Sequence, residues 1–126
     1  MEPKLRLRVV FPDRVMLGPG KADLLELIGQ TGSISAGGRA MGMSYKRAWL
    51  LVETMNAAFR APLVESTRGG PKGGGAELTE MGAAVLAAYR ALEAKARNAG
   101  TSEIAALEAM LLDMSDGKER LRCRSR

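Results

Sequence analysis

Residues 31 to 79 constrain the fold more than any other part of the chain. They read TGSISAGGRAMGMSYKRAWLLVETMNAAFRAPLVESTRGGPKGGGAELT. The stretch begins with two short helical segments joined by a tight turn. A longer helix follows, and then two extended segments around a glycine-rich tip. This order is typical of a winged helix-turn-helix, a module that places one helix in the DNA major groove. The stretch therefore predicts binding rather than catalysis.

Capping and turn residues set the expected boundaries of the central helices. Ser33 is the expected N-cap of a short helix that reaches Met41. Gly42 makes the turn, because a positive φ angle costs glycine little. Ser44 caps a third helix that should run to about Phe59. The core-facing stripe of this helix recurs at three and four residues and consists of Ala48, Val52, Met55 and Phe59.

The flanking segments predict further elements. From residue 5 to residue 10, leucine and valine alternate with mostly polar side chains, which indicates a half-buried strand. The Gly-Pro-Gly sequence at 18–20 interrupts regular structure before a helix over about 21–29. Either Gly29 or Gly32 can end that helix.

Two strands, at 63–67 and 76–78, should flank the glycine-rich tip. Thr79 caps a long helix that begins with Glu80. Its small residues would let another helix approach closely, namely Gly82, Ala84, Ala87, Ala88 and Ala91. A final helix is expected over about 102–114, with an apolar stripe of Ile104, Leu107, Met110 and Leu111.

The expected fold class is mainly α with a small β wing, a winged helix-turn-helix with a long C-terminal dimerisation helix. A chain of 126 residues has room for one domain and an extra helix or tail. We expect a DNA-binding domain with the long helix at 1–97, an additional C-terminal helix at 98–117, and a basic flexible tail at 118–126.

Positive charge is unevenly distributed. The tail at 118–126 has five basic residues and one acid, so it contributes +4 to the net charge of +5. Arg39, Lys46 and Arg47 lie in the expected helix-turn-helix with no acid between them, whereas the segment 77–113 has six acids and three basic residues. A basic front and an acidic back suit a protein that docks one face on phosphates. Ordinary solvated charges are the other interpretation.

Composition argues against an enzyme. The chain has no histidine, which removes the commonest general base and the commonest nitrogen ligand for metals. A phosphate-binding loop needs GxxxxGK followed by Ser or Thr, but Gly20-Lys21 is followed by Ala22, and Lys72 by Gly73. No catalytic residue, no cofactor and no metal are expected.

Cysteine content and hydropathy indicate the compartment. The single cysteine, Cys123, cannot form an internal disulfide, so a reducing cytoplasm is the default. No apolar run approaches the roughly 20 residues that span a bilayer, and the N-terminal segment does not resemble a signal peptide. We expect a cytoplasmic protein with no membrane partner.

The third helix carries the expected DNA chemistry, because the first residues of a recognition helix reach base edges. These are Ser44, Tyr45, Lys46 and Arg47. Arg47 can hold guanine O6 and N7 through two donors, whereas Lys46 suits a phosphate. Tyr45 could donate to a phosphate or pack on a sugar or a thymine methyl. Ser44 suits either a helix cap or a phosphate ligand, and the sequence does not separate these roles.

The glycine-rich tip and Trp49 have two interpretations each. Arg68 and Lys72 would bring positive charge to a tip that can approach the DNA backbone closely, or the tip is a solvated loop. Trp49 lies one position off the core stripe, so it either braces the helix or meets the backbone. Packing is the preferred interpretation for Trp49.

Two segments together resemble a known family. GSISAGGRAMGMSYKRAWLLVETMN and PLVESTRGGPKGGGAELTEMG are similar to the N-terminal DNA-binding domain of the ModE family of molybdate-responsive transcriptional regulators, a relative of the LysR-type winged helix. The resemblance covers roughly residues 5 to 97. It implies a homodimer on an inverted repeat, paired through the long helix and the N-terminal region. The implied DNA contacts are Ser44, Tyr45, Lys46, Arg47, Arg68 and Lys72.

The chain departs from the family pattern in two places. Ala36-Gly37-Gly38 stands where relatives usually have alanines, and glycine costs up to about 1 kcal/mol in a helix, so this helix is expected to be soft. Full-length family members also have C-terminal domains that bind molybdate, and this sequence has a short helix and a basic tail instead. We expect a single-domain member, a partner of a separate sensor protein, or a chain truncated before the sensor.

Three functions are therefore weighed. The leading one is a sequence-specific transcriptional regulator, a homodimer on double-stranded DNA with a link to molybdenum or molybdate metabolism. The alternatives are a nonspecific architectural DNA-binding protein and a protein-interaction adaptor. The operator, the regulated genes, the direction of regulation and the controlling signal do not follow from the residues.

Overall fold

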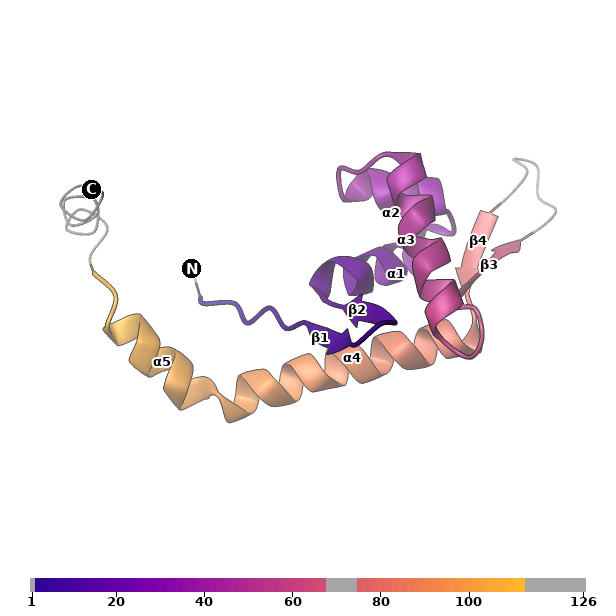
Figure 1. Ribbon diagram of the computed structural model, residues 1–126. Helices are drawn as coiled ribbons and strands as arrows, with labels where there is room; N and C mark the ends of the chain where they lie inside the picture. Colours follow the sequence, from indigo (N-terminus) through magenta and orange to yellow (C-terminus); the bar gives the residue numbers. More distant parts are fainter. Residues whose placement is uncertain (1, 68–74, 113–126) are drawn as a thin grey trace. The chain divides into compact units, whose positions relative to one another are not determined.

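The computed structural model describes residues 2–67 and 75–112. Figure 1 shows a mainly α protein with two short hairpins, so the predicted fold class is confirmed. The elements in chain order are β1 (Val9–Phe11), β2 (Val15–Leu17), α1 (Pro19–Thr31), α2 (Ile34–Ala40), α3 (Tyr45–Ala58), β3 (Val64–Thr67), β4 (Gly75–Leu78), α4 (Glu80–Ala99) and α5 (Thr101–Ala109).

The chain divides into two compact units, and the division falls inside α4. Residues Arg6–Ala94 form one unit, which holds both hairpins and α1 to α3. Met1–Leu5 and the chain from Lys95 onward form the other. No helix of the described residues is long and apolar enough to cross a membrane.

The first hairpin corrects the predicted N-terminal strand. β1 covers only Val9–Phe11 and pairs antiparallel with β2, in the register Val9 to Leu17. Residues 5 to 8 alternate between half-buried and exposed side chains, as the pattern required, but they pair with no strand. Alternating burial alone does not supply a hydrogen-bonding neighbour. The partner strand, β2, was not predicted.

Helix α1 is longer than predicted at both ends. It starts at Pro19, because a proline at the first helical position lacks only an amide that would have had no partner there. It passes Gly29 and ends at Thr31. Gly32 then adopts a left-handed φ of 74° and donates its N–H to the carbonyl of Ile28. Of the two predicted stop residues, the structure uses Gly32.

The helix-turn-helix follows the predicted caps. The hydroxyl of Ser33 accepts a hydrogen bond from the amide of Ala36, and that of Ser44 accepts one from the amide of Arg47. Gly42 lies between α2 and α3 with a φ of 73°, a conformation that side chains rarely adopt. Ala48, Val52 and Met55 are buried as predicted. These local signals confirm both helices.

The glycines of α2 have a packing role, which their helix cost relative to alanine did not indicate. Gly37 and Gly38 are buried where α2 packs between α1 and α3. A Cβ at Gly38 would lie 2.6 Å from the Cβ of Ala48, and one at Gly37 would lie 3.1 Å from a side-chain carbon of Ile28. Close approach to both neighbours therefore accounts for the two glycines.

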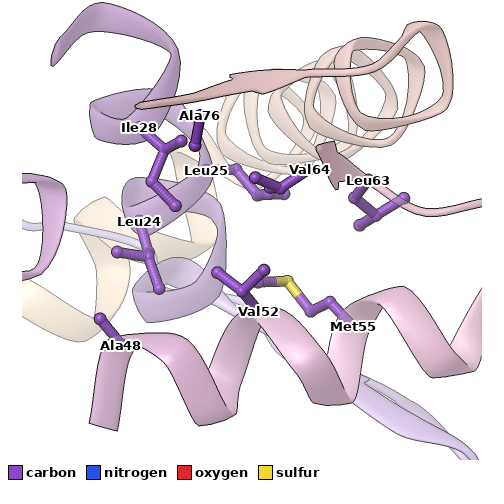
Figure 2. Packing of buried hydrophobic residues seen from close by; sticks show 9 residues of the cluster. All are labelled: Leu24, Leu25, Ile28, Ala48, Val52, Met55, Leu63, Val64 and Ala76. Atoms are coloured by element: carbon purple, nitrogen blue, oxygen red, sulfur yellow. The ribbon is translucent and has the colours of Figure 1, made fainter. Parts of the chain in front are cut away.

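The core fills the space between these helices and the second hairpin. Figure 2 shows its buried side chains converging from α1, α3 and the β3–β4 region, and they are Leu24, Leu25, Ile28, Ala48, Val52, Met55, Leu63, Val64 and Ala76. Burying aliphatic side chains of this size stabilises a fold by about 1.5–3 kcal/mol each. The core thereby fixes the orientation of α3, and with it the side chains on the opposite face of that helix.

The second hairpin follows α3, as a wing should. β3 and β4 pair antiparallel in the register Val64 to Leu78. Asn56 of α3 fastens the start of β3: its side-chain oxygen accepts hydrogen bonds from the amides of Leu63 and Val64, at 2.8 and 3.2 Å. Its side-chain nitrogen donates to the carbonyl of Val64. One side-chain amide thus couples α3 to the second hairpin.

Helix α4 begins at the predicted cap. The hydroxyl of Thr79 accepts a hydrogen bond from the amide of Gly82 at 2.9 Å and donates to the carbonyl of Pro62 at 2.6 Å. Gly82 lies against the backbone of Leu63, where a Cβ would overlap the carbonyl oxygen. Gly82 therefore serves packing within this chain, which corrects its assignment to a face for another helix.

Two adjacent residues of α4 hold the N-terminal elements. Tyr89 is buried with Leu17 and Ala22, and Arg90 bonds to carboxylates of α1. The Arg90 guanidinium lies 2.7 Å from Asp23 and 3.3 Å from Glu26. Burial by itself would lower the pKa of Arg90, but the hydrogen bonds to Asp23 and to Glu93 raise it above its ordinary value. Arg90 therefore stays charged and cross-links α4 to α1.

Helix α5 is shorter than predicted and exposes its apolar side chains. It ends at Ala109 rather than near Met114, which lies outside the described residues. Three residues of the expected stripe are largely exposed, namely Leu107, Met110 and Leu111. Only Ile104 is half-buried. Within the described chain, this stripe does not form a core.

Candidate nucleic-acid interface

The exposed side of α3 brings the predicted contact residues together. Ser44, Tyr45, Lys46 and Arg47 occupy the N-cap and first turn of α3, and all four are exposed. The turn at Gly42 places this end of the helix at the surface, while the buried stripe on the opposite side anchors it. The arrangement leaves two cations and a phenol free to meet a ligand.

The structure assigns Ser44 its capping role. Its hydroxyl oxygen lies 3.1 Å from the amide nitrogen of Arg47, which donates to it. The bond satisfies one of the free amides at the helix start and places Arg47 at a fixed position. Acting as a cap does not prevent the same hydroxyl from donating its proton to a phosphate, because the cap uses it as an acceptor.

A shallow hollow continues this surface along α3. It measures about 270 Å³ and is lined by Ser44, Lys46, Arg47, Leu50, Leu51 and Thr54. Leu50 is 50% exposed, one helical turn beyond Lys46 on the same face. An exposed leucine there suits the methyl group of thymine. The sequence analysis missed Leu50, although its spacing of four residues from Lys46 could have indicated it.

Trp49 does not pack as predicted. Its side chain is 42% exposed, and it does not belong to either cluster of buried apolar residues in the described chain. Tyr45 is 57% exposed on the same helix. Aromatic residues with exposed rings and polar tips are common where proteins meet ligands of mixed polarity. The structure favours the other interpretation of Trp49, a residue available at the surface.

A larger basic cleft shares Arg47 and Leu51 with the shallow hollow along α3. It has a volume of about 650 Å³ and is formed by residues of the N-terminal segment, β2, the start of α1 and α3: Arg6, Arg8, Met16, Gly18, Pro19, Gly20, Lys21, Met43, Arg47 and Leu51. Arg47 thus borders both hollows. In the sequence, Arg6 and Arg8 lie in the alternating segment 5–10, and Lys21 follows Gly20 in a motif that does not fit a phosphate-binding loop.

Only the stem of the wing lies within the described residues. Arg68 and Lys72 lie outside the described residues. In the described part of the hairpin, Glu65 pairs opposite Glu77, and both are exposed. Two carboxylates at this place would repel phosphates, so the described stem of the wing favours no backbone contact of its own.

Acidic side chains of the described residues form an ion-pair network around one arginine rather than a metal-ligand group. Within 2–67 and 75–112, no three Asp, Glu, His or Cys side chains gather as metal ligands would. Asp23, Glu26 and Glu93 each bond to Arg90 instead. Their arrangement suits a structural ion-pair network.

Comparison with curated proteins shows three similar sequences from different bacteria. The chain is 50% identical over 78 residues to the molybdenum-pterin-binding protein MopB of Rhodobacter capsulatus, covering 62% of this chain and 29% of MopB. It is 43% identical over 76 residues to the molybdenum transport protein ModE of Azotobacter vinelandii, covering 60% and 28%. It is 36% identical over 89 residues to the DNA-binding transcriptional dual regulator ModE of Escherichia coli K12, covering 71% and 34%.

The matches cover only part of each relative's length. No protein-family model matches the chain. The chain spans about a third of the length of the curated relatives it matches. A share of this size fits the N-terminal ModE-like domain alone. The predicted resemblance to the N-terminal domain of ModE proteins is therefore confirmed.

Proposed function

We propose that this chain is a transcriptional regulator that binds double-stranded DNA in a sequence-specific manner. The observation that carries the proposal is the exposed first turn of α3, with Lys46 and Arg47 side by side after a tight turn. A relative at 36% identity is named a DNA-binding transcriptional dual regulator, which supports the same function. The cytoplasm is the compartment where such a regulator would act.

In this proposal, α3 enters the major groove and its residues have separate tasks. Arg47 pairs with guanine through two donors, a contact worth about 1–3 kcal/mol of discrimination against the wrong base. Lys46 and Tyr45 contact the backbone, and Ser44 positions Arg47 through its capping bond. Arg68 and Lys72 of the wing tip remain proposed backbone contacts.

We propose further that the protein acts as a homodimer on an inverted repeat. Support comes from apolar side chains that the single chain leaves exposed, namely Leu92, Leu107, Met110, Leu111 and Leu112. The exposed alanines of α4 add a surface that a second helix could approach, and they are Ala84, Ala87, Ala88 and Ala91. Sedimentation equilibrium at micromolar concentration tests this proposal, since a monomer would contradict it.

The names of the relatives also suggest a place in molybdenum metabolism. A molybdenum-pterin-binding protein and a molybdenum transport protein both share this domain. We propose that the controlling signal reaches this domain from another sensor, either a separate protein or a further domain.

Selection of bound sequences from a random duplex library tests the proposed function. Enrichment of one sequence, arranged as an inverted repeat, is the expected result. Binding without enrichment would favour a nonspecific architectural protein, which would use the same basic surface. No salt-dependent DNA binding at all would favour a protein-interaction adaptor, for which the exposed Trp49 and Leu50 would be the contact surface.

A further inference from the structure

The basic cleft beside α3 has the charge of an anion site. Of its lining side chains, four are cations and none is an acid: Arg6, Arg8, Lys21 and Arg47. The ion pairs among residues 2–67 and 75–112 all involve Arg90, so none of these four cations is neutralised by a carboxylate of the described chain. Four cations around one hollow repel each other unless an anion enters.

The cleft is built by contacts that hold its cations in place. Lys21 donates a 2.8 Å hydrogen bond from its ammonium to the carbonyl of Met16, which leaves two of its three donors for a ligand. The side chain of Arg8 lies over Gly18, where an added Cβ would be 3.1 Å from its Cγ. Tyr89 bonds to the carbonyl of Leu7 at 2.7 Å and so secures the backbone between Arg6 and Arg8.

Backbone amides add to this positive surface. Gly18, Pro19 and Gly20 line the cleft at the start of α1, a helix of 13 residues. Gly18 has no side chain with which to cap the helix and Pro19 has no N–H, so the amides of Gly20 and Lys21 are those without a side-chain cap. An oxyanion accepts hydrogen bonds from such amides and from guanidinium groups at once.

From this geometry we propose that the cleft binds a phosphate group, and that Arg6, Arg8 and Lys21 are its ligands. The favoured source is the DNA backbone next to the groove that α3 enters, because Arg47 borders both the cleft and the hollow on α3. That source rests on the proposed function. The other source of the same chemistry is a free phosphate in solution.

The test measures how DNA affinity depends on salt in the R6Q/R8Q variant of the full chain. Each phosphate contact that is lost reduces the slope of log affinity against log salt by about 0.9. We expect a slope smaller by about 0.9 on both the selected sequence and an unrelated duplex, with their affinity ratio unchanged. A changed ratio would mean that the arginines read bases, and it would overturn the proposal.

The matched control is R14Q/R60Q. Arg14 and Arg60 are exposed, do not line the cleft, and remove the same charge when changed. A slope change as large as that of R6Q/R8Q would show a general charge effect and contradict a specific site. The control therefore separates the cleft from the net charge.

A second arm distinguishes the two sources of phosphate. Inorganic phosphate is titrated into the DNA-free protein at constant ionic strength, and the amide signals of Gly20 and Lys21 are followed by NMR. A reduced slope in R6Q/R8Q assigns the cleft to the DNA backbone. An unchanged slope together with saturable shifts that R6Q/R8Q lacks assigns it to a free anion. If the slope is unchanged and phosphate causes no saturable shifts, the proposal is overturned.

The phosphate site in the cleft can still be tested if the proposed sequence-specific function is wrong. A chain that selects no sequence still has a measurable salt slope on an unrelated duplex, and the cleft is tested by that slope. Conversely, a clear sequence preference with an unchanged slope would support the proposed function and exclude the DNA backbone as the source of the phosphate.

Discussion

The hydroxyl of Tyr89 in α4 donates a 2.7 Å hydrogen bond to the carbonyl of Leu7, a residue 82 positions earlier in the chain. Tyr89 is only 2% exposed, so its ring packs in the protein while its hydroxyl reaches the N-terminal segment. The contact joins a core residue to the stretch that carries Arg6 and Arg8. It ties residues 6–8 into the compact unit Arg6–Ala94.

Tyr89→Phe should lower the free energy of unfolding by about 1 kcal/mol, because one intramolecular hydrogen bond is lost while the ring still packs. Urea denaturation checks this, with a lower midpoint and an unchanged slope. Tyr45→Phe is the matched control: Tyr45 is 57% exposed on α3 and should leave the midpoint unchanged. Equal midpoints for wild type and Tyr89→Phe would show that the bond adds nothing.

Alkaline pH should destabilise the protein partly through Tyr89. Burial raises the pKa of Tyr89 above its ordinary value of 10.0, and the nearby Glu93 carboxylate raises it further. The folded state therefore keeps a proton that the unfolded state loses. The contribution of neutral Tyr89 to the free energy of unfolding is complete below pH 10 and disappears as the pH rises through the folded pKa. Stability should fall more steeply above pH 10 in wild type than in Tyr89→Phe. Parallel profiles would contradict this.

Gly82→Ala should be strongly destabilising. The new Cβ would overlap the carbonyl oxygen of Leu63 and lie 2.9 Å from its carbonyl carbon, so α4 or the start of β3 must shift. We expect a loss of at least about 2 kcal/mol by thermal or urea unfolding. Gly20→Ala is the control, since a Cβ there meets no atom within 4 Å and should be neutral or slightly stabilising. Similar stabilities for the two variants would contradict the close approach.

Arg90→Lys should lower stability by about 1 kcal/mol, because a single ammonium cannot reproduce the separate contacts of the guanidinium with Asp23, Glu26 and Glu93. The loss should shrink in high salt, which screens partly exposed ion pairs. Arg97→Lys serves as the control, since Arg97 is exposed and makes no ion pair within the described residues. A salt-independent loss would point to packing of the side chain instead.

Local signals made most of the fold predictable. Ser33, Ser44 and Thr79 act through hydrogen bonds to amides three residues away, so the sequence alone reveals them. The bonds of Asn56 to β3 and of Arg90 to α1 join residues 8 to 67 positions apart, and no short pattern indicates them. Gly82 was misassigned for the same reason, since its neighbour, Leu63, is brought to it by the fold.

Some residues of the candidate site could likewise be predicted from the sequence, whereas others could not. The run from Ser44 to Arg47 could be recognised because adjacent residues form the start of one helix. Arg6 and Lys21 could not be linked to Arg47, because their common cleft depends on how β2, α1 and α3 pack. Helical periodicity could have added Leu50, whereas the exposure of Trp49 required the structure.

Arg47→Lys shows whether α3 reads DNA sequence through Arg47. Lysine keeps the charge but presents one ammonium in place of the planar pair of donors that matches guanine. The quantity to measure is the ratio of affinities for the selected sequence and an unrelated duplex at one salt concentration. We expect this ratio to fall by about 5- to 150-fold, with nonspecific affinity nearly unchanged. An unchanged ratio would mean that sequence preference arises from residues other than Arg47.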